Sequence, residues 1–204
     1  LIILESFSKE YIGALNKNME NGNYKGYTPF LDSLIDKSIV FPNTYANTKR
    51  SVEAIPAILV GIPALMNDSY ISSKYSGNTI NSIAGLLKTK GYSSAFYHGG
   101  TNGTMGFDNF VKMAGFDRYY GRTEYNNDKD YDGKWGIFDD KFLQFTAVQL
   151  TKMKQPFVAA VYTLSSHHPY IIHNKKKSLV PKGELAIHQS IAYTDYSLNK
   201  KKKK

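Results

Sequence analysis

A serine in the first third of the chain has surroundings that suggest chemistry. Ser51 follows two cations and precedes an apolar run, in Asn47-Thr48-Lys49-Arg50-Ser51-Val52-Glu53-Ala54-Ile55-Pro56. This pattern predicts a helix start, where free backbone N–H groups and the helix dipole favour negative charge. A hydroxyl there could serve as an alkoxide nucleophile or bind a phosphate or sulfate. The alternative is that Ser51 only caps the helix, and taken alone the residue fits the cap better.

A carboxylate comes directly after an apolar run at the beginning of the chain. Glu5 follows Leu1–Leu4, which has the composition of a buried parallel strand. A carboxylate in that position could hold a divalent metal, and a metal would activate a serine by lowering the pKa of its hydroxyl. A solvated strand end is the alternative for Glu5.

Histidines follow two other predicted strands. His167 and His168 come after the apolar run Phe157–Val161, and His98 ends the run Tyr92–Tyr97. A histidine in such a place could bind metal, donate to a phosphate oxygen or transfer protons. The alternative is a loop histidine bonded to a backbone carbonyl, and the case for His98 is weaker than that for His167.

The elements that must position these residues alternate between strands and helices. The apolar runs predict strands at Leu1–Leu4, Ser38–Tyr45, Tyr92–Tyr97 and Gln155–Leu164. Helical spacing and end signals predict helices at Tyr27–Lys37 (with Thr28 as N-cap), Ser51–Gly61, Thr79–Lys90, Gly136–Met153 and Leu185–Leu198. No element is predicted in the Gly-, Asn- and Asp-rich stretch from Gly99 to Lys134. The alternation indicates an α/β sandwich with a mainly parallel sheet, whose strands' carboxyl ends would form one site.

Composition and charge exclude several classes of protein. The 204 residues are 42% hydrophobic and contain no cysteine, which excludes a disordered chain, a disulfide framework and a cysteine nucleophile. The net charge of +9 suggests a polyanionic partner, but without the five lysines at 200–204 the chain has 21 basic and 17 acidic residues. Three more lysines are consecutive at Lys175–Lys177. The longest apolar run, 54–66, is too short to span a bilayer. Because the chain starts inside a strand without Met, we expect a fragment whose upstream part carried any anchor or export signal.

Four blocks of sequence resemble a known family. The chain is similar to the lipoteichoic acid synthase and phosphoglycerol transferase group of the alkaline phosphatase superfamily, often labelled sulfatase-like. The resemblance runs in order to about Leu198, and its matching blocks are Leu1–Phe7, Ala46–Leu59, Tyr97–Gly100 and Ser166–Tyr170.

The resemblance implies a fold and a set of roles. The fold would be an alkaline-phosphatase-like α/β sandwich with a mainly parallel central sheet, truncated at both ends. Glu5 would be a metal ligand, and Ser51 would be both nucleophile and metal ligand, in a position where the group often has threonine. His167 would contact the substrate's head group. Beside the resemblance, the position of Arg50 next to Ser51 and that of His98 at a strand end make these two further candidates for substrate binding. One divalent metal is expected, with Mn or Mg favoured over Zn at an oxygen-rich site.

The sequence departs from the family in three places. It contains no Asp-His pair, which completes the metal site in the family, so we expect an incomplete metal site here. The family's Trp-Asn-Arg segment, which helps to hold glycerol phosphate, is replaced by Met105-Gly106-Phe107-Asp108. The lysine run 200–204 has no counterpart. In addition, Ser51–Ile55 lacks the Pro and Arg of a formylglycine motif, which argues against sulfate ester hydrolysis by that route.

These observations lead to a functional prediction with two alternatives. We expect residues 1–199 to be the N-terminal part of a sulfatase-like catalytic domain and 200–204 to lie outside the fold. The expected function is metal-dependent transfer of a phospholipid head group, such as phosphoglycerol, through a phospho-serine intermediate. Phosphoethanolamine transfer or another phosphodiesterase or hydrolase reaction is the first alternative, and a non-catalytic basic membrane-binding module is the second. The expected partners are an anionic phospholipid and a polyol or glycan acceptor, without nucleic acid, at the extracytoplasmic side of the cell membrane through an N-terminal anchor.

Overall fold

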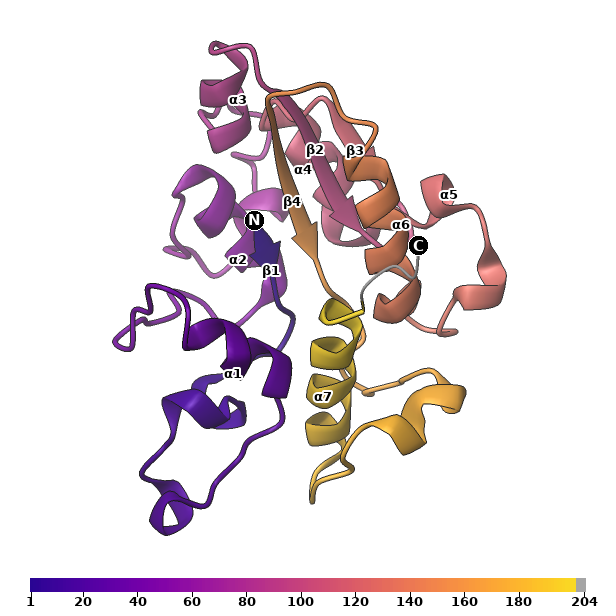
Figure 1. Cartoon of the computed structure of the whole chain (residues 1–204). Helices are drawn as coiled ribbons and strands as arrows, with labels where there is room; N and C mark the ends of the chain where they lie inside the picture. The colour runs from indigo at the N-terminus through magenta and orange to yellow at the C-terminus, as the bar shows by residue number, and fades with distance from the viewer. Residues whose placement is uncertain (201–204) are drawn as a thin grey trace. The chain divides into compact units, whose positions relative to one another are not determined.

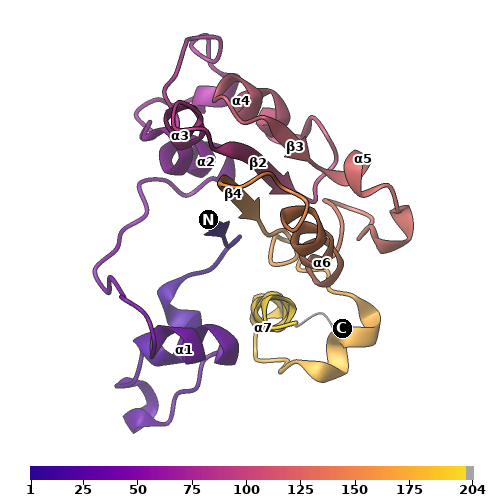
Figure 2. The same ribbon diagram turned by 45° about the horizontal axis from the view of Figure 1, so that its top comes forward.

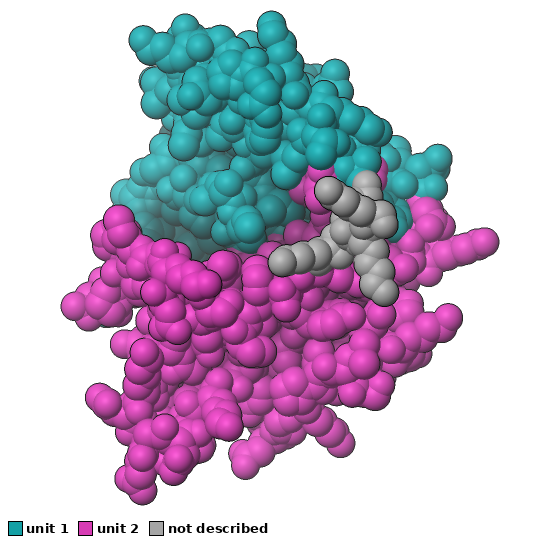
Figure 3. Space-filling view, viewed as in Figure 1, with its two compact units in different colours: residues 1–3, 45–126, 148–162 teal, residues 4–44, 127–147, 163–204 magenta. Residues whose placement is uncertain are grey.

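The computed structural model describes residues 1–200 (Figure 1). The chain divides into two compact units, which Figure 3 shows in two colours. Unit 1 consists of Leu1–Ile3, Tyr45–Asn126 and Val148–Tyr162. Unit 2 consists of Leu4–Thr44, Asn127–Ala147 and Thr163–Lys204, the last four residues of which lie outside the described part. The predicted domain bounds, 1–199 with 200–204 outside the fold, stay predictions.

Unit 1 is built on a parallel sheet. Its strands within residues 1–200 are, in spatial order, β1 Ile2–Ile3, β4 Phe157–Tyr162, β2 Ser93–His98 and β3 Arg118–Tyr120. Each neighbouring pair is parallel, with Ile2 opposite Val161 and Ser93 opposite Phe157. The continuous apolar run in β4 is typical of a strand inside such a sheet. The predicted α/β fold with a parallel sheet is thereby confirmed.

Three helices of unit 1 pack on one face of this sheet (Figure 2). The helices of unit 1 are α2 Ser51–Val60, α3 Ile83–Lys88, α4 Phe107–Met113 and the short α5 Arg122–Tyr125. The apolar side chains of α2, α3 and α4 form one core with the strands, including Ile55, Leu59, Ala84, Phe107, Phe110, Phe96 and Ala160. This core anchors α2, and therefore fixes where Ser51 stands relative to the sheet.

Two helix predictions in unit 1 need correction. The helix predicted at Thr79–Lys90 begins only at Ile83, because Ser82 caps it by accepting a hydrogen bond from the N–H of Gly85 (3.0 Å). The prediction had no element between Gly99 and Lys134, yet α4 and β3 lie there. Apolar spacing at Phe107, Phe110 and Val111 is the signal that indicates α4, and the surrounding glycines obscured it.

Helices dominate unit 2. It contains α1 Pro29–Ile35, the first part of α6 Asp139–Leu150, and α7 Ala186–Leu198. The carboxylate of Asp195 in α7 accepts hydrogen bonds from the N–H groups of Phe30 and Leu31, both at 2.9 Å. Thr28 occupies the predicted N-cap position of α1, but its side chain makes no capping bond, and Asp195 supplies the cap instead.

The strand predicted at Ser38–Tyr45 is wrong. Helix α1 ends at Ile35, and residues 38–45 form no strand in the structure. Ile39 and Phe41 are 87% and 77% exposed and Val40 is only partly buried, so this segment contributes little to a core. Pro42 has no N–H to give to a ladder, which weakens the segment as a strand.

The second half of the chain follows the prediction closely. Helices α6 and α7 and strand β4 lie within the predicted ranges; α7 differs only at its first residue, and α6 and β4 are shorter at both ends. Helix α7 has 13 residues. None of the helices in residues 1–200 has the length and apolar composition of a bilayer-spanning segment.

Candidate active site

Glu5 lies two residues beyond the end of β1, and residues that follow β4 hold its backbone on both sides. Its N–H donates to the Oγ1 of Thr163 (3.0 Å), and its carbonyl oxygen accepts from the Oγ of Ser166 (2.5 Å). The hydroxyl of Ser6 donates to Oε1 of Glu5 (2.7 Å). Thr163 and Ser166 are buried, so water does not compete for these bonds. The segments after β1 and β4 are therefore joined at Glu5, as expected beyond the carboxyl ends of neighbouring parallel strands.

A buried aspartate shapes the loop that leads to His167. The carboxylate of Asp139, in the first turn of α6, accepts from the N–H groups of Leu164 (2.8 Å) and Ser165 (3.1 Å) and from the hydroxyl of Thr194 (2.7 Å). Its own N–H donates to the Oγ of Ser165 (3.0 Å). Burial raises the pKa of Asp139 to about 6. Asp139 thus fixes the backbone immediately before His167.

His167 packs against the only tryptophan of the chain. The rings of His167 and Trp135 have centroids 4.3 Å apart at an angle of 53°. The Nδ1 of His167 lies 2.7 Å from the carbonyl oxygen of His168, which also accepts from Nε1 of Trp135 at 2.8 Å. Because a carbonyl only accepts, Nδ1 of His167 carries a proton, and in the neutral ring Nε2 is the basic nitrogen. The predicted alternative, a loop histidine bonded to a backbone carbonyl, thus holds for Nδ1 of His167. Nε2 is the nitrogen that could take part in chemistry.

Ser51 is the first residue of α2, and the N-cap of that helix is Arg50. The hydroxyl is therefore located one position inside the helix, and the interpretation of Ser51 as the N-cap is wrong. Ser51 is partly exposed, at the end of a ten-residue helix whose first turn contains Glu53. This position places Ser51 at the positive end of the helix dipole.

Arg50 is engaged by an acidic neighbour. Its Nη2 donates to Oε1 of Glu53, and also to the carbonyl oxygen of Asn67 at 3.0 Å. The hydroxyl of Thr48 donates to the other oxygen of Glu53. The hydrogen bonds from Arg50 and Thr48 lower the pKa of Glu53, which is thus held as a carboxylate. The positive charge of Arg50 beside Ser51 is therefore partly compensated by Glu53, so the residue is a weaker anion ligand than its sequence position suggests.

His98 has the surroundings of a core histidine. Only 1% of its surface is exposed, and it stacks on Tyr162 (5.2 Å, 15°) with Phe107 edge-on. Burial lowers its pKa to about 3, so the ring is neutral. A Cβ at Gly100 would lie 2.6 Å from Cε1 of His98, so the glycine makes room for this ring. The predicted contact of His98 with substrate stays a prediction.

The structure brings some of the predicted residues together within one unit. Glu5 and the loop that carries His167 belong to unit 2 and share hydrogen bonds, whereas Arg50 and Ser51 belong to unit 1. The approach of Ser51 to Glu5 therefore stays a prediction. As metal donors, the Glu5 carboxylate and a serine hydroxyl suit Mn or Mg in kind. Two such donors do not complete a metal site. Residues 1–200 contain no group of three His, Cys, Asp or Glu side chains that could hold a metal ion.

The prediction missed Asp139, Trp135 and the two hydroxyl residues, Thr163 and Ser166, that hold the backbone of Glu5. Asp139 looks in the sequence like an ordinary acid in the first turn of a helix, and its partners Leu164 and Thr194 are far along the chain. Trp135 lies in the Asp- and Gly-rich stretch and carries no periodic signal. Its status as the single tryptophan was the one cue that could have drawn attention to it.

The parallel sheet, the helices on its face and the polar groups beyond its strand ends define an α/β fold of the alkaline phosphatase type. A solved protein of the alkaline phosphatase superfamily from Vibrio parahaemolyticus superposes with a TM-score of 0.82 at 28% identity, covering 97% of this chain and 47% of that one. Residues 1–200 match the Sulfatase family, and the chain belongs to it.

Relatives with named activities are similar over most of this chain. A lipoteichoic acid synthase from Staphylococcus saprophyticus is 30% identical over 187 residues, which cover 87% of this chain and 27% of the relative. The solved lipoteichoic acid synthase LtaP from Listeria monocytogenes has a TM-score of 0.76 at 20% identity, over 97% of this chain and 50% of that chain. The periplasmic domain of EcEptC from Escherichia coli, solved in complex with Zn, has a TM-score of 0.64 at 16% identity, over 97% and 56%. The chain thus spans about a quarter of the curated relative and about half of the solved chains.

Proposed function

We propose that the protein containing this chain is a phosphotransferase that acts on a phospholipid head group with Ser51 as its nucleophile. The observation that carries the proposal is the position of Ser51, first residue of α2, in a chain that belongs to the Sulfatase family throughout residues 1–200. The N–H groups and dipole of the first turn of α2 favour the negative charge of a phosphate and of the developing alkoxide.

The reaction has two displacements. In the first, Oγ of Ser51 loses its proton and forms a bond to phosphorus, while the bond from phosphorus to the lipid oxygen breaks and that oxygen takes up a proton. In the second, the oxygen of an acceptor hydroxyl loses its proton and bonds to phosphorus, and Ser51 leaves with a proton. A phospho-serine intermediate thus lies between donor and acceptor.

Glu5 is proposed as one ligand of a divalent ion. Its backbone is held by Thr163 and Ser166 and its carboxylate by Ser6, so the carboxylate has a fixed position beyond β1. A bound Mn or Mg ion would supply Lewis-acid activation of the serine and neutralisation of phosphate charge. The Zn complex of EcEptC supports a metal in this fold, although two donors of residues 1–200 do not complete a site.

His167 is proposed to orient the head group. Because Nδ1 donates to the carbonyl of His168, Nε2 is the nitrogen that can face a ligand. In the protonated ring Nε2 donates to a phosphate oxygen, and in the neutral ring it accepts from a hydroxyl. Trp135, packed against the ring, restricts its rotation.

We propose the substrates by analogy with the relatives. Lipoteichoic acid synthases among them support an anionic phospholipid donor, such as phosphatidylglycerol, and a polyol or glycan acceptor. The periplasmic domain of EcEptC supports an extracytoplasmic location at the cell membrane.

A substitution of the nucleophile tests the proposal. In the full-length protein, Ser51→Ala should abolish turnover and the covalent phosphate on the protein, because the alanine has no oxygen to phosphorylate. Ser51→Thr, which keeps a hydroxyl at the helix start, should retain both. Turnover is measured by thin-layer analysis of radiolabelled lipid, and the adduct by mass spectrometry of the peptide containing residue 51.

Undiminished turnover in Ser51→Ala would contradict the proposal that Ser51 is the nucleophile. The same lipid analysis identifies the group that is transferred, because phosphoglycerol and phosphoethanolamine products migrate differently. A product that contains phosphoethanolamine would leave the proposed role of Ser51 intact but would show that the transferred head group is phosphoethanolamine.

A further inference from the structure

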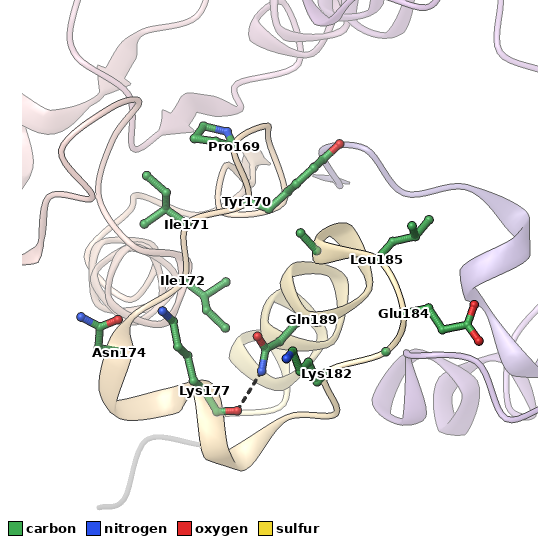
Figure 4. Close-up of a pocket in the computed structure, with 12 residues that line it drawn as sticks. Pro169, Tyr170, Ile171, Ile172, Asn174, Lys177, Lys182, Glu184, Leu185 and Gln189 are labelled. Atoms are coloured by element: carbon green, nitrogen blue, oxygen red, sulfur yellow. Dashed lines mark hydrogen bonds between the residues drawn. The ribbon is translucent and has the colours of Figure 1, made fainter.

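A pocket in unit 2 opens directly after the loop that carries His167. Its volume is about 400 Å³, within the range of small-molecule sites. It is lined by the chain from Pro169 to Ile172, by Asn174, Lys177 and Lys182, and by the first turn of α7 with the residues before it (Figure 4). None of these residues has a part in the function proposed above.

The walls of the pocket are of two kinds. Ile171, Ile172 and Leu185 give an apolar surface, and Ile172 is buried. Lys177 and Lys182 bring two positive charges to the lining, with the ammonium end of Lys177 beside Ile172 and Asn174 and that of Lys182 beside Gln189 in Figure 4. Both lysine side chains are exposed, so their ammonium groups are accessible to a ligand that enters the pocket.

The acidic residue in the lining does not compensate these lysines. Glu184 extends away from Lys177 and Lys182 in Figure 4. Its charge acts instead on Tyr27, whose pKa is raised by burial and then by Glu184. The pocket therefore keeps a net positive charge.

The frame of the pocket is well fixed. The amide of Gln189 in α7 donates to the carbonyl oxygen of Lys177 (3.0 Å), which ties the lysine-bearing segment to the helix. Gly183 has a φ of +63°, and a Cβ there would lie 2.5 Å from the Cβ of His188. His188 stacks in turn on Tyr27, with centroids 4.3 Å apart at 18°. The two lysines are thus carried by backbone that packing holds in place.

We propose that this pocket binds an organic phosphate ester, with the phosphate between Lys177 and Lys182 and the carbon skeleton against Ile171, Ile172 and Leu185. The first turn of α7, which also lines the pocket, adds its N-terminal dipole to the two charges. The site goes beyond the proposed function, because its binding requires neither Ser51 nor turnover.

Protection of lysines from acetylation tests the site in the full-length protein. Glycerol 3-phosphate should slow the acetylation of Lys177 and Lys182, measured by peptide mass spectrometry, and leave Lys175 unchanged. Lys175 is the matched control, since it lies in the same lysine run, is exposed and does not line the pocket. Glycerol without phosphate should protect none of them. Protection by vesicles containing phosphatidylglycerol, but not by free glycerol 3-phosphate, would identify a lipid head group as the source of the phosphate.

Two comparisons separate this proposal from its alternatives. Lys177→Ala and Lys182→Ala should each weaken the binding of the phosphate ester about tenfold, and Lys175→Ala should not. Equal protection or equal loss at Lys175, or binding that vanishes when residues 201–204 are removed, would overturn the proposal in favour of non-specific attraction. No protection by either probe would overturn it as well. Ser51→Ala should show full protection, so a failed nucleophile and a failed pocket give different results.

Discussion

In unit 1, neighbouring parallel strands satisfy each other's backbone groups, and the core beside them is aromatic and aliphatic. In unit 2, buried carboxylates satisfy some of the backbone N–H groups instead, since Asp195 accepts from the start of α1 and Asp139 accepts from the loop after β4. Unit 1 buries a histidine as well, but keeps it neutral among rings. The need to satisfy buried polar groups is thus met mainly by strand pairing in unit 1, where Ser82 adds a helix cap, and by buried carboxylates at two places in unit 2.

The difference has a functional consequence. Backbone pairing between strands positions the strands and is compatible with many sequences. A carboxylate that accepts from two adjacent N–H groups, in contrast, positions one particular loop. The carboxylate of Asp139 holds the loop that leads to His167, and the hydroxyls of Thr163 and Ser166 hold the segment that contains Glu5. We therefore expect the geometry of the candidate site to depend on single buried polar residues of unit 2, and the stability of unit 1 to depend on packing.

The largest expected effect is the loss of a core ring from unit 1. Phe96 is completely buried, stacks on Tyr119 (6.1 Å, 13°) and meets Phe116 edge-on (6.0 Å, 82°). Phe96→Ala should lower the free energy of unfolding by about 3–5 kcal/mol through lost burial and a cavity. Denaturant titration measures this, with Phe41→Ala as the exposed control, expected within about 0.5 kcal/mol of the wild type. Equal effects of both substitutions would contradict a packed core in unit 1.

The next effect is the acid sensitivity that His98 gives to unit 1. Its folded pKa is about 3, below the value of about 6.5 expected in the unfolded chain. Between these values the unfolded state binds the proton, so stability falls as pH falls below about 6.5. In His98→Phe this contribution is absent. From pH 7.5 to 4.5, the wild type should lose about 3 kcal/mol relative to the variant.

Asp139 of unit 2 should give a smaller effect of opposite sign. Its folded pKa of about 6 lies above the value of about 3.9 for an unfolded aspartate, so the folded state binds the extra proton between them. Its contribution to stability is therefore largest at low pH and is lost as pH rises through about 6. From pH 7.5 to 4.5, the wild type should gain about 2 kcal/mol relative to Asp139→Asn, measured by the same titrations.

If lowering the pH changed the stability of the wild type in the same direction relative to both variants, the contrast between the units would be contradicted. The activity of Asp139→Asn gives a second test of this contrast. Because Asp139 holds Leu164 and Ser165, which precede His167, its loss should reduce turnover of the full-length protein even at temperatures where the variant stays folded. Unchanged turnover would show that the loop does not need this carboxylate.

Prediction from sequence succeeded where a pattern is local. The apolar run of β4, the strand before His98 and the helix from Ser51 to Gly61 were all indicated by neighbouring residues. It failed at Ser38–Tyr45, where an apolar pattern finds no sheet to join, and at α4, where glycines hide a short helix. For the candidate site, the sequence indicated Glu5, Ser51 and His167, but it left open that Ser51 is the N-cap of its helix. The sequence pattern does not distinguish the N-cap from the first helical residue, and in the structure the N-cap is Arg50.

The sequence by itself determined the class of fold, the family and the residue types at the strand ends, since these depend on periodicity and on short contiguous motifs. Only the tertiary structure decided which of those residues share a hydrogen-bond network, that His98 is buried and neutral, and that Arg50 donates to the carbonyl oxygen of Asn67. It alone placed Lys177 and Lys182 around one pocket. The physical reason is that burial, pairing and pocket walls arise from residues distant in the chain, and their chemistry depends on the surroundings that folding creates.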